Sequence, residues 1–387
     1  MTLFKERFWT TGKLRAGCAV LWAGVMAATL WPFNPWPRNE VKWLGAGNGV
    51  HFGKNGIVLT AGDFDNLSPL WEHPCSLEIL LRAGSETDVS TLLGFYEVNR
   101  STGLRLRQYV DGLLIFHDVP DGKSGWKAWE MDVDHVFRRA APTLLTITSG
   151  TRGGTRVYLN GKLAQINSGY RLSTSDFAGQ LIIGTSPYSY DTWTGELRGL
   201  AAFPRELDQN EVREHYAEWT QNGKLQSATP GEVIGSYAFE ERAGNVVQNQ
   251  VPGGTELKIP PHFEIPMKLV LTPPWKEITP PAIYAADLAR NILGFLPLGM
   301  LFYLYFLRGH RRGRAAGLTI LLGGMTSLLI EILQVFIPQR VSGMTDIITN
   351  TLGTCVGLWL LQPRPIRVML EKLGMLRTTP DERTVRN

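Results

Sequence analysis

The chain has 387 residues, of which 44% are hydrophobic and 19% charged, and its mean hydropathy of -0.07 is that of a soluble protein when averaged over the whole sequence. The net charge of +4 is small and its basic residues lie beside apolar runs, which argues against a nucleic-acid partner. Three cysteines, Cys18, Cys75 and Cys355, predict neither an intrachain disulfide framework nor a cysteine metal site, and we expect no cofactor or metal.

An uncharged segment near the N-terminus predicts a first membrane span. Residues 16–37 carry no charge, which is about long enough to cross a ~30 Å hydrocarbon core. Trp31, Phe33 and Trp36 are placed to form an aromatic belt at the far interface. A cleaved signal peptide is the alternative, but its small-x-small cleavage site is poorly formed here. We therefore predict an uncleaved anchor within residues 1–38.

From about Glu40 the sequence changes to short alternating runs that are broken by Gly, Asp and Asn. Asp111-Gly112 and Asn160-Gly161 favour tight hairpin turns. Many short strands without an intervening helix indicate an antiparallel β-sandwich over residues 39–264, in which one amphipathic helix follows Asp208 as its N-cap. The expected strands cover residues 49–53, 57–61, 76–82, 90–96, 104–110, 113–117, 144–148, 155–159, 163–166, 181–184 and 196–203.

The later strands carry a resemblance to a known family. The segments TRVYLNGKLAQI, QLIIGTSP and TGELRGLAAFPRELDQNEVREHY resemble the ending of a laminin-G-like, concanavalin-like jelly roll. The resemblance implies a domain that binds glycans, proteins or lipids. Exposed aromatic side chains could stack on sugar rings, and the alternative is that they fill the core or cover the sheet. The candidates are Trp126, Trp129, Tyr188, Tyr190 and Trp193.

A Pro-rich linker at residues 265–283 leads to three further apolar runs, at residues 291–307, 315–339 and 347–363, within a membrane domain expected over 284–363. Basic residues precede the first span, separate the second from the third, and follow the fourth in a tail at 364–387. The positive-inside rule then predicts four transmembrane helices in the cell membrane, with both termini cytoplasmic and residues 40–285 outside. The sandwich would be inserted between helices 1 and 2.

Polar residues lie inside these spans at helical spacing. Ser327, Glu331 and Gln334 fall at i, i+4 and i+7, and Asp346 and Asn350 are four apart on the next span. An ionisable residue within a span is costly and indicates a site, while the alternative is a clamp that packs helices together. The predicted topology brings these residues to one depth near the outer leaflet, which favours an outward-facing pocket. Its candidate residues are Asp287, Asn291, Ser327, Glu331, Gln334, Arg340, Asp346 and Asn350.

Within that pocket we expect Arg340 to lie within ion-pair reach of Glu331 or Asp346, because pairing is less costly than leaving buried charges apart. We also expect Asn350 to face the third span.

The same residues carry a second resemblance. RNILGFLPLG and SLLIEILQVFIPQRVSGMTDIITNTLGTCVG, at residues 290–299 and 327–357, resemble the VanZ-like membrane family. This resemblance implies a compact four-span domain, and the family's founding member is linked to resistance to a glycopeptide, teicoplanin. The inserted sandwich departs from the family pattern.

Two function classes follow. In the first, the chain is a non-catalytic envelope protein whose sandwich binds an exported glycan or protein and whose membrane pocket binds a lipid or lipid-linked ligand. In the second, it is an intramembrane enzyme or transporter for such a lipid, with acid–base chemistry from Glu331 and Asp346 and with Arg340 on a phosphate or carboxylate. The sequence contains no Walker loop, dinucleotide fingerprint or metal-binding His motif, so we favour the first class.

Overall fold

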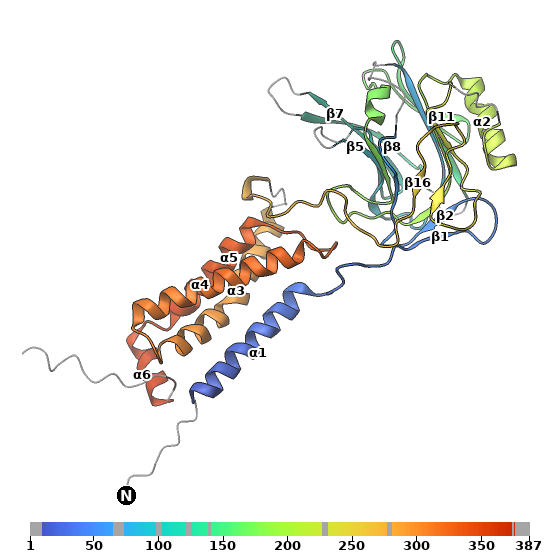
Figure 1. Cartoon of the computed structure of the whole chain (residues 1–387). Coiled ribbons are helices and arrows are strands. Elements are labelled where there is room, and N and C mark those ends of the chain that lie inside the picture. Colours follow the sequence, from blue (N-terminus) through green and yellow to red (C-terminus); the bar gives the residue numbers. More distant parts are fainter. Residues whose placement is uncertain are drawn as a thin grey trace, which may run out of the picture. The chain divides into compact units, whose positions relative to one another are not determined.

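The computed structural model describes residues 10–64, 73–97, 103–120, 126–137, 141–226, 231–276, 281–373 and 375. These residues form two compact units. The sandwich unit is Trp36–Lys268, and the helical unit combines Met1–Pro35 with Leu269–Asn387 (Figure 1). The helical unit therefore draws its residues from both ends of the chain.

Two antiparallel sheets, each of eight strands within the described residues, make up the sandwich unit (Figure 1). The first has the order β1-β2-β13-β4-β9-β10-β11, with β14 paired to β13. Its strands are β1 (Val41–Trp43), β2 (Val50–Phe52), β4 (Cys75–Ala83), β9 (Thr143–Gly150), β10 (Gly154–Leu159), β11 (Lys162–Asn167), β13 (Gly195–Phe203) and β14 (Gly235–Tyr237).

The second sheet has the order β15-β16-β3-β12-β5-β6-β7-β8. Its strands are β3 (Val58–Thr60), β5 (Val89–Tyr96), β6 (Arg105–Tyr109), β7 (Gly112–Pro120), β8 (Trp126–Val133), β12 (Gln180–Ile183), β15 (Val246–Val247) and β16 (Leu257–Lys258). The predicted antiparallel sandwich is thus confirmed, and every expected strand overlaps an observed one.

The middle of the first sheet is buried on both faces. Along β4, Ile79 and Leu81 belong to the core between the sheets, whereas Leu80 packs outward against helix α2 (Gln209–Asn222). Asp208 caps α2 as predicted, because its carboxylate accepts hydrogen bonds from the main-chain N–H groups of the first turn. The outer face of this sheet therefore has a helical cover of its own.

The helical unit contains five helices within its described residues (Figure 1). They are α1 (Thr11–Leu30), α3 (Pro281–Phe306), α4 (Arg312–Gln334), α5 (Met344–Leu360) and α6 (Arg364–Lys372). An apolar cluster that includes Cys18, Phe302 and Ile330 joins α1 to α3 and α4. The Nε1–H of Trp22 also donates a hydrogen bond to Oγ1 of Thr326 over 3.1 Å, so α1 is tied to α4 by a polar contact.

Helices α3 and α5 approach closely because two glycines of α5 face the backbone of α3. A Cβ added at Gly353 would overlap the carbonyl oxygen of Ile292, and one at Gly357 would overlap that of Leu296. Small residues at such a position allow two helix backbones to come together and gain dispersion contacts. The glycines thus fix how α5 lies along α3.

The expected count of four membrane-spanning helices is confirmed only in part. Three described helices are long and apolar enough to cross a membrane: Thr11–Leu30, Ala285–Phe306 and Arg312–Gln334. Helix α5 has 17 residues, as many as the run expected at 347–363, but it lies three positions earlier, because it starts after Gly343 and ends shortly before Pro363. Along the chain, the strands of the sandwich follow α1 and precede α3.

Candidate functional site

The polar residues of the helical unit are placed by one buried face of α4 and the start of α5. Ser327, Glu331 and Gln334 are all buried on α4, as their spacing implies. Asp346 lies in the first turn of α5 and Asn350 one turn later. The two helices are joined by a short connection, so these side chains come together at one end of both.

Three of these residues pack α4 against the start of α5. Glu331 is 1% exposed, and its Oε2 accepts a hydrogen bond from the main-chain N–H of Gly343 at 2.8 Å. That N–H precedes α5, where the free donors of a helix start need partners. Asn350 donates from Nδ2 to Oγ of Ser327 over 2.9 Å, so Asn350 faces α4, as expected. Glu331 and Ser327 therefore have the contacts that the packing alternative requires.

Asn350 and the remaining predicted polar residues line a cavity of about 520 Å³ within the helical unit. This volume falls in the range of sites that hold small ligands. Six of the eight predicted pocket residues line it; Ser327 and Glu331 are not among them. The lining residues are Val25, Ala28, Thr29, Asp287, Arg290, Asn291, Gly294, Phe295, Gln334, Gln339, Arg340, Val341, Asp346 and Asn350.

Hydrogen bonds hold the acidic side of this cavity in place. Nη1 of Arg290 lies 2.6 Å from Oδ1 of Asp287, and both side chains are exposed to a large extent. Nδ2 of Asn291 donates to Oδ1 of Asp346 over 2.8 Å, which joins α3 to α5. Both carboxylates thus have partners within the helical unit.

Arg340 lies between α4 and α5 and reaches toward the end of α1. Its Nη2 donates a hydrogen bond to the main-chain carbonyl of Trp31, while its Nε is buried without a hydrogen-bond partner among the described residues. Nε2 of Gln334 likewise donates to the carbonyl of Thr29 over 3.0 Å. The last turn of a helix has carbonyls without intrahelical partners, and these two side chains supply donors there.

The contribution of α1 to the cavity was not predicted. Thr29 is the polar lining residue that sequence reasoning missed on α1, and Gln339 was missed beside its predicted neighbour Arg340. The adjacency of Gln339 to Arg340 was a usable signal. Nothing in the spacing of α1 itself indicated that Thr29 would face a cavity shared with α3.

The aromatic candidates of the sandwich unit separate by burial. Trp193 is 0% exposed, packs edge-on against Phe52 and donates from Nε1 to Oε1 of Gln108 over 2.9 Å. The prediction that it stacks on sugar is therefore wrong, because its indole is part of the core. Tyr188 and Tyr190 pack beside an apolar cluster at the sheet surface. The side chain of Trp126 lies outside the described residues, although its backbone belongs to β8.

Trp129 keeps the exposure that a stacking platform needs. Its side chain is 43% exposed, and it lines a second cavity, in the sandwich unit, of about 370 Å³. Among the described residues, no group of three or more His, Cys, Asp or Glu side chains is arranged to hold a metal ion.

Comparison with known proteins identifies part of the chain. Residues 216–366 match the family model described as VanZ/LLP1. The match includes α3, α4 and α5 and extends back into the sandwich unit as far as α2. The resemblance to the VanZ-like family is thus confirmed, and with three helices long enough to span a membrane the chain is a membrane protein that joins a VanZ-like domain to a β-sandwich. No curated protein matches the chain.

Several solved structures are similar to this chain over about half of its length. The receptor-binding domain of botulinum neurotoxin D is 15% identical with a TM-score of 0.37, covering 48% of each chain. The binding domain of serotype D is 14% identical with a TM-score of 0.37, covering 49% of this chain and 47% of that one. The receptor-binding domain of the mosaic serotype C/D neurotoxin is 15% identical with a TM-score of 0.36, covering 48% of this chain and 46% of that one. This chain therefore spans about half the length of these structures.

Proposed function

We propose that this chain is a cell-envelope membrane protein that holds a lipid or lipid-linked ligand in the cavity of the helical unit and a glycan or an envelope protein on the sandwich unit. The observation that carries the proposal is the 520 Å³ cavity with polar residues from α3, α4 and α5. Residues that only packed helices together would fill one another's hydrogen bonds and leave no space of this size.

Arg340 gives the ligand its chemical class. Its buried Nε has no hydrogen-bond partner among the described residues, and an unsatisfied buried donor is costly. A guanidinium binds carboxylate and phosphate groups through paired N–H donors. Asn291, whose amide is a hydrogen-bond donor, lines the same cavity. We therefore propose an anionic head group, phosphate or carboxylate, next to Arg340.

The proposed arrangement in the membrane has four spans, with both termini in the cytoplasm. Helix α5 would be the fourth span. Its 17 residues extend about 26 Å, which is close to, although slightly less than, the ~30 Å thickness of a hydrocarbon core. Arg311, Arg312, Arg364 and Arg367 lie at the ends of α4 and α6 that would face the cytoplasm, which the positive-inside rule favours. The sandwich unit would then be outside the cytoplasm.

Reporter fusions test this topology directly. A reporter fused after Trp219 should be active only outside the cytoplasm, and one fused after Asn387 only inside. Cytoplasmic activity of the Trp219 fusion would contradict the four-span arrangement and the exported sandwich.

Lipid analysis tests the ligand. Mass spectrometry of lipids that co-purify with the intact protein should find a phosphate- or carboxylate-bearing species, and Arg340→Ala should remove most of it. Arg312→Ala is the matched control, because Arg312 begins α4 and does not line the cavity. Equal retention by both variants, with both proteins folded, would refute the proposed role of Arg340.

The proposed class remains non-catalytic because both residues expected to act as acid or base have structural partners. Glu331 is hydrogen-bonded to Gly343 and does not line the cavity, and Asp346 lines the cavity but accepts a hydrogen bond from Asn291. A link to glycopeptide resistance is a proposal that rests on the VanZ-like domain, and a deletion strain tested for teicoplanin susceptibility would check it.

A further inference from the structure

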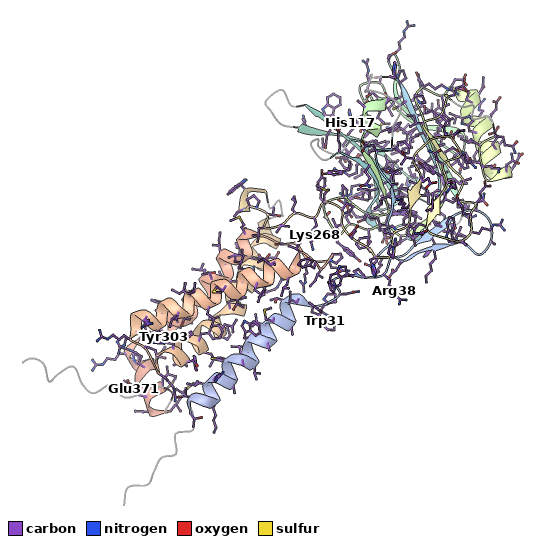
Figure 2. The ribbon with its side chains drawn as sticks, viewed as in Figure 1. Trp31, Arg38, His117, Lys268, Tyr303 and Glu371 are labelled. Carbon is purple, nitrogen blue, oxygen red and sulfur yellow. The ribbon has the colours of Figure 1, made fainter. Side chains whose placement is uncertain are left out.

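The second cavity lies in the sandwich unit, at the edge of the second sheet. Its lining residues are His117 on β7, Trp129 on β8, and Ser168, Gly169 and Arg171 just after β11. His117 and Trp129 are direct neighbours in the register of the antiparallel pair β7 and β8. Figure 2 shows His117 on this part of the sandwich unit. Two strands of the second sheet and the segment that follows β11 of the first sheet thus line one concave site.

Trp129 presents a held but accessible aromatic surface. Its ring lies at 87° to that of His117, with centroids 6.2 Å apart. The buried hydroxyl of Tyr170 donates to the carbonyl of Ile115 over 2.9 Å and approaches that of Trp129 at 3.4 Å, which joins the loop after β11 to both strands. The backbone beneath the indole is therefore fixed, while 43% of the side chain remains open to solvent.

His117 is oriented by a carboxylate and leaves one nitrogen unused. Its Nδ1 lies 3.4 Å from Oδ1 of Asp176, whose Oδ2 accepts from the main-chain N–H of Ser173 at 2.8 Å. The residue is 8% exposed, and its Nε2 is buried without a hydrogen-bond partner among the described residues. In the tautomer whose Nδ1–H points to Asp176, Nε2 is a hydrogen-bond acceptor, and a ligand O–H would satisfy it.

We infer that this cavity is a saccharide-binding subsite. One sugar ring would stack on Trp129 and donate a hydroxyl hydrogen to Nε2 of His117, with the exposed side chains of Ser168 and Arg171 on its outer oxygens. A flat apolar platform beside several hydrogen-bonding groups suits a pyranose, which has an apolar C–H face and a rim of hydroxyls. The inference rests on the proposed function, because it locates the glycan site of the sandwich unit.

The test measures binding of defined sugars to the full chain in lipid nanodiscs. The probes are β-1,4-linked hexamers of glucose and of N-acetylglucosamine, titrated by calorimetry. For whichever hexamer binds the unaltered protein, Trp129→Ala should raise the dissociation constant about tenfold or more. His117→Phe, which keeps an aromatic ring but removes Nε2, should weaken it by roughly fivefold or more.

Tyr109→Ala is the matched control, since Tyr109 is 55% exposed at the end of β6, in the same sheet, and does not line the cavity. It should bind like the unaltered protein. If a hexamer binds and neither Trp129→Ala nor His117→Phe weakens it, the subsite is wrong while the proposed glycan function stands. If neither hexamer binds the unaltered protein, the subsite as stated is overturned, whereas retention of an anionic lipid by the helical unit remains a separate result.

Discussion

The strongest prediction concerns Glu78, a fully buried carboxylate that anchors α2 to the first sheet. Its side chain is 0% exposed and accepts three hydrogen bonds. Oε1 lies 3.3 Å from Oγ1 of Thr146 and 3.2 Å from Nδ1 of His215, and Oε2 lies 3.0 Å from Nε1 of Trp219. Two of these partners belong to α2, so the carboxylate holds the helix to β4.

Glu78→Gln keeps the shape but removes the charge and one acceptor oxygen. Because a hydrogen bond to a charged group contributes about 1.5–3 kcal/mol, we expect α2 to lose that much local stability. By hydrogen exchange this is a fall of about 10- to 150-fold in the protection of amides in α2. The measurement uses mass spectrometry on the full chain at pH 6, where His215 is charged.

The matched control makes the same substitution at an exposed ion pair. Nζ of Lys224 lies 3.2 Å from Oε2 of Glu240, and both side chains are more than 40% exposed, so Glu240→Gln should cost less than about 1 kcal/mol. If Glu78→Gln changes the protection of α2 no more than Glu240→Gln does, the anchor described for Glu78 is refuted.

The same anchor predicts a pH dependence. Burial lowers the pKa of His215, but the hydrogen bond and charge of Glu78, with further charge from Glu218 and Glu211, outweigh it and raise the pKa above its ordinary value. A raised pKa means that protonation stabilises the folded state, so the contribution is complete below about pH 6.5 and is lost as pH rises through the folded pKa. Protection of α2, corrected for intrinsic exchange, should fall from pH 6 to pH 9, and less so in Glu78→Gln.

Two further predictions concern the separate units. Gly357→Val should destabilise the helical unit by about 1–3 kcal/mol or more in denaturant titrations, because the new side chain would overlap the carbonyl of Leu296. Gly317→Val on α4 is the control and should not destabilise the unit in this way, because a side chain at Gly317 would enter open space. A fragment of residues 36–268 should be soluble with a β-rich circular dichroism spectrum, because it has its own core; a helical spectrum, or insolubility of the fragment in every buffer, would contradict this.

Most of the sandwich was predictable because its strands show regular alternation and its turns carry a local signal. Asn160 has a φ of 52° and Gly161 a φ of 77°, the left-handed backbone that the Asn-Gly dipeptide indicated. Strand β8 was not predicted, because residues 127–130 of this edge strand are all exposed and, among its described side chains, only Met131 and Val133 at its end are buried. So short an alternation between buried and exposed residues is a weak strand signal.

Long-range partners were harder to predict than elements. The burial of Trp193 depends on Gln108, which is 85 residues away in sequence and supplies the acceptor that a buried indole N–H needs. The helical spacing of Glu331 correctly placed it on a buried face, but the sequence could not indicate that its partner would be a main-chain N–H at Gly343. In both cases the residue type was informative and its partner was set by the tertiary fold.

The predicted polar residues of the helical unit differ in whether they line the cavity, which separates candidates for a packing clamp from candidates for a ligand site. Ser327 and Glu331 are buried and bonded to groups at the start of α5, as a clamp requires. Arg290, Arg340 and Asp346 line the cavity instead.

The two sets of residues should respond differently to substitution. Leaving a buried hydrogen-bonding group unpaired lowers the stability of the fold, whereas replacing a side chain that lines the cavity removes contacts with the ligand and lowers its affinity. Glu331→Gln should thus lower the denaturation midpoint with little change in the lipid retained per folded protein. Arg340→Ala should do the reverse, and a variant pair that shifts both readouts together would show that clamp and cavity are one structure.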